Sequence, residues 1–147
     1  MPGKDWKRRS QREEALHAAF VRMLMRAPVK SVRFHDHDKR VSLTLLGERF
    51  SYAVLVKREV YVGHWGRDKS VDIDRGMFSR GRMRSFRALA LHEAVEKHLV
   101  ERYGLRLSEE AHVVATAKER QYLKHAGGNW KSHQMMVYHL WSKLDGH

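Results

Sequence analysis

The chain has 147 residues, of which 42% are hydrophobic and 31% charged, a composition that indicates one compact domain rather than a disordered polycation. It contains no cysteine, which excludes disulfide scaffolds, thiolate zinc sites, iron–sulfur clusters and cysteine nucleophiles. Lys and Arg outnumber Asp and Glu by 29 to 17, so the formal net charge is +12. No apolar run approaches the roughly 18 residues of a membrane-spanning helix, and the charged first residues carry no apolar leader. We therefore expect a cytoplasmic protein without a membrane partner.

The first half of the sequence predicts a helix followed by a small sheet. Ser10 and Glu13 form a capping-box pattern, after which apolar residues recur at helical spacing over residues 11–26. From residue 31 to residue 74 the hydrophobic period changes to two, which predicts an antiparallel meander of four or five short strands. The last two strands are expected at residues 60–63 and 70–74.

The last third of the sequence predicts three helices, at residues 83–103, 108–125 and 129–143. Gly104 is a candidate C-terminal cap for the first of them, and Ser108 and Asn129 are candidate N-terminal caps for the other two. The predicted fold is therefore a single α+β domain over residues 1–147, in which the helical part, residues 83–143, carries the candidate site.

Two pairs of polar residues lie inside the apolar stripes of these helices. His92 and Glu96 are four residues apart and share a helix face, and His112 and Glu119 are two turns apart and share a face of the next helix. A buried carboxylate needs a partner or a cation. Because the connection around Gly104 is short, we expect the two helices to pack antiparallel by their apolar faces. The four polar side chains could then converge.

Such a group of residues suits zinc or a related divalent ion, bound at one site. We predict His92, Glu96 and His112 as ligands, and Glu119 as a fourth ligand or as the group that orients a histidine. Glu93 occupies the position of the general base in H-E-x-x-H metallopeptidases, although the motif here reads H-E-x-x-E. An additional anionic ligand makes the ion a weaker Lewis acid, so a structural metal that ties two helices together is a further possibility.

The same residues also allow a buried polar network without any metal. In that interpretation His92 is hydrogen-bonded to Glu119 and His112 to Glu96, and every charge has a partner. The sequence alone leaves both interpretations open.

Two motifs suggest a family. The run A-L-H-E-A-V-E-K-H at residues 90–98, followed by A-H-x-x-A-x-x-x-E at residues 111–119, resembles small phage- and prophage-encoded proteins that look like reduced zincin-type metallopeptidases. The resemblance covers about residues 58–141 and leaves residues 1–57 without a counterpart. It implies a zincin-like fold, a metal at His92, Glu96 and His112, and Glu93 as the base of a peptide or amide hydrolase. A phage-encoded protein of this kind would act in the host cytoplasm.

A second function class rests on the positive charge. Five arginines and no carboxylate lie between residues 75 and 87, at Arg75, Arg80, Arg82, Arg84 and Arg87. As a basic loop they could neutralise phosphates, which predicts a non-enzymatic module that binds nucleic acid or an acidic protein. In that case the affinity for DNA should fall steeply between about 50 and 200 mM salt. Negligible binding of DNA at low salt would exclude this role.

The remaining histidines are interpreted as structural. The run at residues 35–38, His-Asp-His-Asp, is typical of a hairpin turn, which needs no metal. His98 lies away from the His92 face and is expected at the surface. His133 lies in an apolar and aromatic stripe of the last helix, where it is either a satisfied core histidine or within reach of the site.

Overall fold

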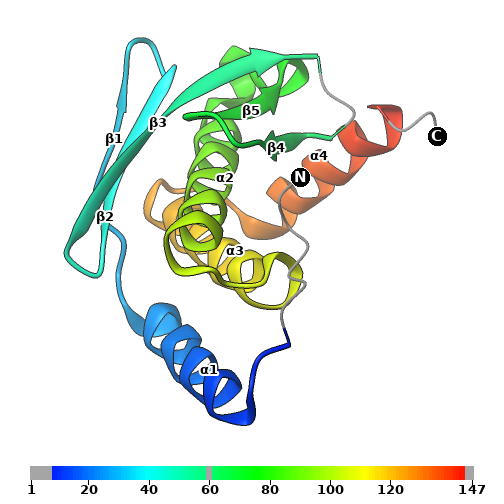
Figure 1. The fold of residues 1–147 in the computed structure, drawn as a ribbon. Helices are drawn as coiled ribbons and strands as arrows, with labels where there is room; N and C mark the ends of the chain where they lie inside the picture. Colours follow the sequence, from blue (N-terminus) through cyan, green and yellow to red (C-terminus); the bar gives the residue numbers. More distant parts are fainter. Residues whose placement is uncertain (1–7, 59–60, 145–147) are drawn as a thin grey trace.

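The computed structural model describes residues 8–58 and 61–144 and confirms the α+β fold class. Helix α1 (Gln11–Arg26) precedes a five-stranded mixed sheet, and three helices follow it (Figure 1). The strands are β1 (Lys30–His35), β2 (Arg40–Leu45), β3 (Glu48–Lys57), β4 (Gly63–Trp65) and β5 (Ser70–Asp74). The C-terminal helices are α2 (Met83–Tyr103), α3 (His112–His125) and α4 (Trp130–Leu144), close to the predicted bounds.

The sheet is only partly the expected meander. Strands β1, β2 and β3 are antiparallel neighbours, but the order is β1-β2-β3-β5-β4, with β5 parallel to β3 and β4 antiparallel to β5. After β3 the chain forms β4 at the edge of the sheet. It then returns and forms β5 between β3 and β4. In this place between two strands, Val71 and Ile73 on one face of β5 are fully buried, whereas Asp72 on the other face is partly exposed. The strand expected at residues 60–63 is instead Gly63–Trp65, and residue 60 lies outside the described residues.

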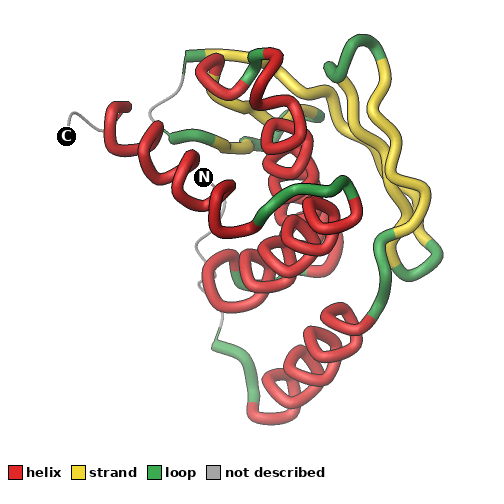
Figure 2. The backbone as a smooth tube through the Cα atoms, turned by 180° about the vertical axis from the view of Figure 1, so that it is seen from behind, coloured by secondary structure: helices red, strands yellow, loops and turns green. Residues whose placement is uncertain are grey.

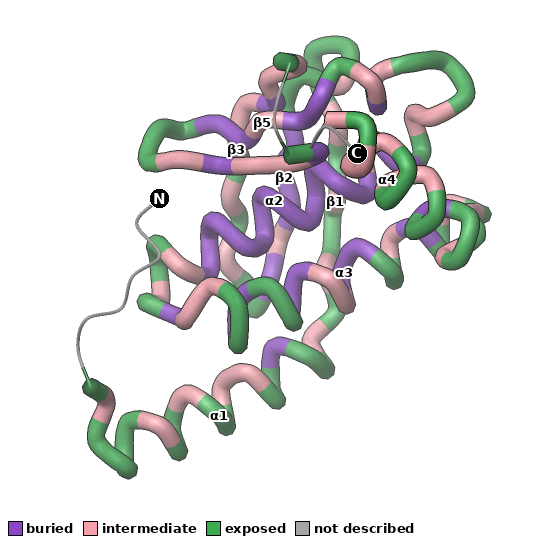
Figure 3. Tube along the Cα trace, turned by 90° about the vertical axis from the view of Figure 1, so that its right-hand side faces the viewer, coloured by how far each residue is buried: buried purple, intermediate pink, exposed green. Residues whose placement is uncertain are grey.

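Helix α2 is the centre of the domain. The sheet covers one side of it and α3 packs on another, so 14 of its 21 residues are buried (Figure 3). The helix ends where predicted, because Gly104 adopts the left-handed conformation with φ +67° and its N–H donates to the last carbonyls. This central position brings one face of α2 against the edge of the sheet and another against α3.

Hydrogen bonds connect both ends of helix α1 to the rest of the helical part. Its predicted capping box is present. Just before it, Arg9 donates two hydrogen bonds of 2.8 Å to Glu110. At its C-terminal end, the buried Lys118 of α3 donates to the Ala27 carbonyl at 2.5 Å, so a cation meets the negative end of the helix. Helix α1 thus lies beside α3, away from the sheet (Figure 2).

The connection from α2 to α3 differs from the prediction. A π-helical turn at Leu107–Ala111 leads into α3, and Ser108 lies inside this turn without capping anything. The wide turn makes His112 the first residue of α3. At the start of α4 the predicted cap is confirmed, because Asn129 Oδ1 accepts a 2.9 Å hydrogen bond from the Ser132 N–H. Over residues 8–58 and 61–144, none of the helices is both long enough and apolar enough to span a bilayer.

Candidate metal centre

The four predicted polar residues come together between α2 and α3. His92 Nδ1 lies 2.8 Å from Glu119 Oε1, and His92 Nε2 lies 3.2 Å from Glu96 Oε2. His112 Nδ1 is 2.8 Å from the same Glu96 oxygen, and the rings of His92 and His112 are 4.8 Å apart. The convergence expected from helical spacing is therefore present.

Three of these side chains could hold one metal ion. One ligand atom each from His92, Glu96 and His112 can be chosen so that all lie within 4.8 Å of one another. Ligands of a tetrahedral zinc ion at about 2.0–2.1 Å lie about 3.4 Å apart. The observed contacts of 3.2 Å and 2.8 Å to Glu96 are slightly shorter than this spacing. Small side-chain movements would therefore accommodate an ion, and the donor set fits zinc.

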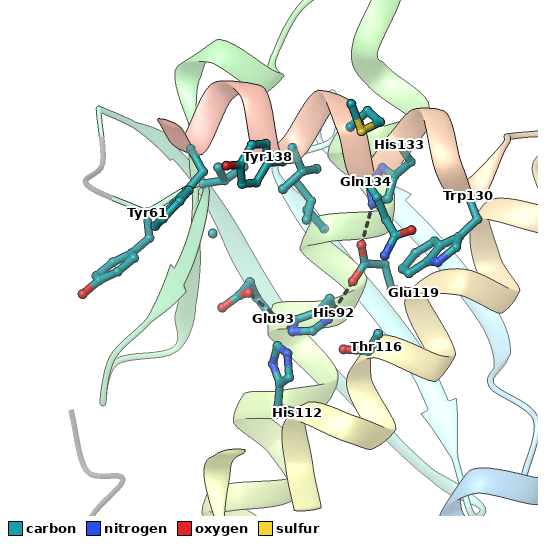
Figure 4. Close-up of a pocket in the computed structure, with 16 residues that line it drawn as sticks. Tyr61, His92, Glu93, His112, Thr116, Glu119, Trp130, His133, Gln134 and Tyr138 are labelled. Carbon is teal, nitrogen blue, oxygen red and sulfur yellow. Dashed lines mark hydrogen bonds and ion pairs between the residues drawn. The ribbon is translucent and has the colours of Figure 1, made fainter. Parts of the chain in front are cut away.

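Glu119 lies on the far side of the His92 ring from Glu96. It contacts Nδ1 of His92, which leaves Nε2 facing Glu96 and His112. Its other oxygen lies 2.5 Å from His133 Nε2, and His133 Nδ1 lies 2.8 Å from the Ser85 hydroxyl (Figure 4). Of the two roles predicted for Glu119, this geometry favours the group that orients His92. His133 therefore reaches the site through Glu119, which is one of the two interpretations predicted for it.

The edge strand β4 supplies two further residues to the site, Gly63 and Trp65. In the register of β4 with β5, Gly63 and Trp65 alternate with His64 and face α2. The Trp65 indole N–H donates to Glu96 Oε1 at 2.9 Å and fixes that carboxylate. At Gly63 a Cβ atom would lie 3.0 Å from Glu93 Oε2, so glycine lets the strand approach the carboxylate closely.

Glu93 differs from the rest of the group, because its carboxylate makes no hydrogen bond to any of the described residues. It is buried, and its nearest charged neighbour among them is His92, whose Nε2 lies 3.9 Å from Glu93 Oε2. Burial raises the pKa of Glu93 to about 8, and repulsion from Glu96 and Glu119 acts in the same direction against the attraction of His92. The carboxylate points into the cleft in front of the cluster (Figure 4). An unpartnered acid with a raised pKa in a cleft is a candidate for proton transfer.

Glu96 and His92 are charged and lie in contact with each other. Burial opposes the ionisation of Glu96, but hydrogen bonds with His112 and His92 outweigh it and lower its pKa to about 2. Burial likewise disfavours the charged form of His92, but its contacts with the carboxylates of Glu119 and Glu96 raise its pKa to about 10. A metal ion at Nε2 would have to displace this proton, because a coordinating imidazole is neutral there.

The nearby buried ammonium group does not neutralise the cluster. Lys97 is fully buried next to Glu96 in sequence, but its Nζ donates to the Gly66 carbonyl and to Glu101, the latter at 2.9 Å. Its ammonium nitrogen lies over the Trp65 ring, 5.2 Å from the ring centre. Among the described residues, the carboxylates of Glu96 and Glu119 are therefore paired with imidazoles and one indole rather than with a lysine or arginine.

The geometry bears on both interpretations of the sequence. The pairs His92–Glu119 and His112–Glu96 are those that the metal-free network predicts. A closed network, however, would also satisfy Glu93 and bury His112, whose side chain is 56% exposed. The cluster is instead open on the side of Glu93 and His112. Catalytic metal sites keep such an open position, and structural ones are closed.

The basic segment is not the free loop that was expected. Two short 3₁₀ turns, Arg75–Met77 and Arg80–Arg82, lead directly into α2. Arg82 and Arg84 donate to the carbonyls of Gly76 and Gly127. Arg87 forms a bidentate ion pair with Asp38 in the β1–β2 turn. Arg75 and Arg80 remain exposed. Binding of a polyanion to this segment stays a prediction, with fewer free guanidinium groups than the sequence suggested.

Two further predictions concern histidines. The predicted turn is present at residues 36–39, directly after His35 at the end of β1, and its Asp38 pairs with Arg87. His98 is not at the surface: it is buried, stacks on Phe50 with ring centres 3.7 Å apart, and hydrogen-bonds Glu48 at 2.9 Å. The sheet wraps over this side of α2, which helical periodicity could not show.

Comparison of the chain with protein-family models, with curated proteins and with solved structures gives no match. Fold and site together define an α+β protein in which α2 and α3 bring together a group of His and Glu side chains that could hold a metal ion.

Proposed function

We propose that the protein is a zincin-like, metal-dependent amide or peptide hydrolase with one divalent ion at His92, Glu96 and His112. The observation that carries this proposal is the pairing of a compact ligand group with Glu93, which makes no hydrogen bond to the described residues and lies at an open cleft. The H-E-x-x-E motif on a buried helix beside the sheet supports it further.

Each neighbouring residue has a defined task in this proposal. When bound, the ion would supply the Lewis acid that polarises the substrate carbonyl. Glu93 would take a proton from the attacking water and pass it to the leaving amine, a task for which a pKa near neutrality is suited. Trp65 fixes Glu96, and Glu119, in contact with Nδ1 of His92, would leave Nε2 available as a ligand once that nitrogen has lost its proton.

The first test is the metal content of tag-free protein, measured by mass spectrometry after zinc is supplied and the excess removed. We expect about one equivalent of zinc in the native protein and a loss of that equivalent in His92→Ala, because His92 is central to the cluster. A tag-free sample is needed because the chain has 11 histidines of its own.

His125→Ala is the matched control, since His125 is exposed in the last turn of α3, away from the cluster. It should keep the zinc. Absence of zinc from the native protein, or equal loss in both variants, would contradict the proposed function. The cluster would then be the buried network, and the arginine segment would be tested for nucleic-acid binding instead.

A further inference from the structure

One cleft of about 680 Å³ opens directly beside Glu93, between α4 and the metal cluster. His92, Glu93 and His112 lie on one side of it, and side chains of α4, among them Tyr138, lie across from them (Figure 4). A second cleft, of about 700 Å³, shares Glu93 and both histidines and continues past Trp65. The first cleft is here named the α4 cleft. When the reacting amide of a substrate lies at Glu93, the neighbouring group of that substrate would lie in the α4 cleft.

The walls of the α4 cleft are apolar and in part exposed. Trp130, Val137 and Trp141 line it from α4, together with Leu89 from α2. At its rim, Met135 and Tyr138 are each 62% exposed and Tyr61 is 56% exposed. Single exposed apolar side chains are ordinary, but a group of them around one cavity marks a binding surface.

The charges of the α4 cleft determine what kind of group it accepts. Its ionisable side chains are Glu93, Glu119, His92 and His112 on the side of the cluster, His133 of α4, which hydrogen-bonds Glu119, and the phenols at its rim. Within the described part of the chain, no Lys or Arg lines it. An acidic group would be repelled by the carboxylates, and a strongly hydrated cation would lose its water against indole and thioether surfaces. An aromatic or large aliphatic side chain suits these walls best.

We infer that the α4 cleft is a specificity subsite for an apolar, above all aromatic, side chain adjacent to the amide that is cleaved. This inference rests on the proposed function and adds the substrate class: peptides or amides with an aromatic residue at the cleavage point. Helix α4 then sets the specificity, while α2 and α3 supply the chemistry.

The test compares two zinc-binding probes that differ only in the side chain. N-acetyl-phenylalanine hydroxamate and N-acetyl-glycine hydroxamate are titrated into zinc-loaded protein by calorimetry. The phenylalanine probe should bind about tenfold tighter or more, because burial of a benzyl group on this scale has that effect. In the double variant Met135→Ser, Tyr138→Ser this preference should shrink several-fold, while the glycine probe binds as before.

A control variant and a metal-free measurement distinguish failure of the subsite from failure of the proposed function. Leu16→Ser removes an equally exposed apolar side chain on α1 and should leave the preference unchanged. Equal affinity for the two hydroxamates, or an equal loss in Leu16→Ser, would overturn the subsite while the metal site stands. If no zinc binds, the proposed function fails. N-acetyl-phenylalaninamide should then still shift the indole NMR signals of Trp130 and Trp141 more than N-acetylglycinamide does, and equal shifts would overturn the α4 cleft as well.

Discussion

Replacing Glu93 with glutamine is expected to stabilise the metal-free protein, and increasingly so between pH 5 and pH 8. Burial raises the pKa of Glu93 from 4.5 to about 8, so the folded protein keeps a proton that the unfolded chain releases. The stability associated with Glu93 is therefore fully present below pH 4.5 and is lost as the pH rises through 8. Over this range the loss is about 1.4 kcal/mol per pH unit. Glutamine is neutral at every pH and removes this dependence.

Thermal melts of both proteins at pH 5 and pH 8 in the presence of a chelator measure this effect. The difference in Tm should be small at pH 5 and should grow by several degrees at pH 8. Glu109→Gln is the control, since the Glu109 side chain is 73% exposed and should show no such trend. If Glu93→Gln were less stable at pH 8 than the native protein, Glu93 would be ionised and paired, contrary to its surroundings here.

The same variant separates metal binding from chemistry. Since Glu93 is not among the three grouped ligands, Glu93→Gln should keep its equivalent of zinc. It should lose hydrolysis of a quenched-fluorescence peptide library by about 10²-fold or more, as enzymes that lose a general base do. A variant that gains stability and loses activity marks a residue kept for function at the expense of stability. Retention of activity would remove Glu93 from the mechanism.

The sequence was sufficient for the helical part of the site because the information there is local. His92 and Glu96 share a face through the 3.6-residue period, and His112 and Glu119 share one over two turns. Because the connection after Gly104 is short, α3 packs on α2. No long-range contact had to be guessed to bring these four residues together.

The sheet's part of the site could not be predicted in this way. Trp65 reaches Glu96 only because β4 is the edge strand and β5 lies between it and β3. Strand order depends on packing between segments distant in sequence, and a period of two is the same in parallel and antiparallel strands. The role of Gly63 is equally non-local, since it depends on the distance of a strand from a carboxylate on a helix.

Helical periodicity also underestimates burial when a helix is covered on more than one side. The helical period predicts that the stripe through His92 is the inward face of α2 and that His98 lies at the surface. The sheet covers that second side and places Phe50 and Glu48 on His98. An amphipathic pattern thus identifies one buried face of a central helix, and the others become visible only in the tertiary structure.

Glu119→Ala is expected to be among the most damaging substitutions in the protein. Glu119 is a buried carboxylate that bridges His92 Nδ1 at 2.8 Å and His133 Nε2 at 2.5 Å. Removal of one partner from a buried ion pair costs about 3–5 kcal/mol, because the remaining group keeps its desolvation penalty without its attraction. Chemical denaturation of the metal-free variant should show a loss of this size, whereas Glu109→Ala should change the stability by less than about 0.5 kcal/mol.

The carboxylate should matter to the metal as well as to the fold. With Glu119 absent, the His92 ring loses the contact at Nδ1 that helps to direct Nε2 at Glu96 and His112, and zinc affinity should fall about 10- to 100-fold. Glu119→Gln separates shape from charge, because the amide keeps the volume and one acceptor oxygen. It should fold more stably than Glu119→Ala and bind zinc with an intermediate affinity, measured by competition with a chromophoric chelator. If both variants bound zinc as tightly as the native protein, His92 would be positioned by packing alone, and the chain from Ser85 through His133 to Glu119 would be a structural network only.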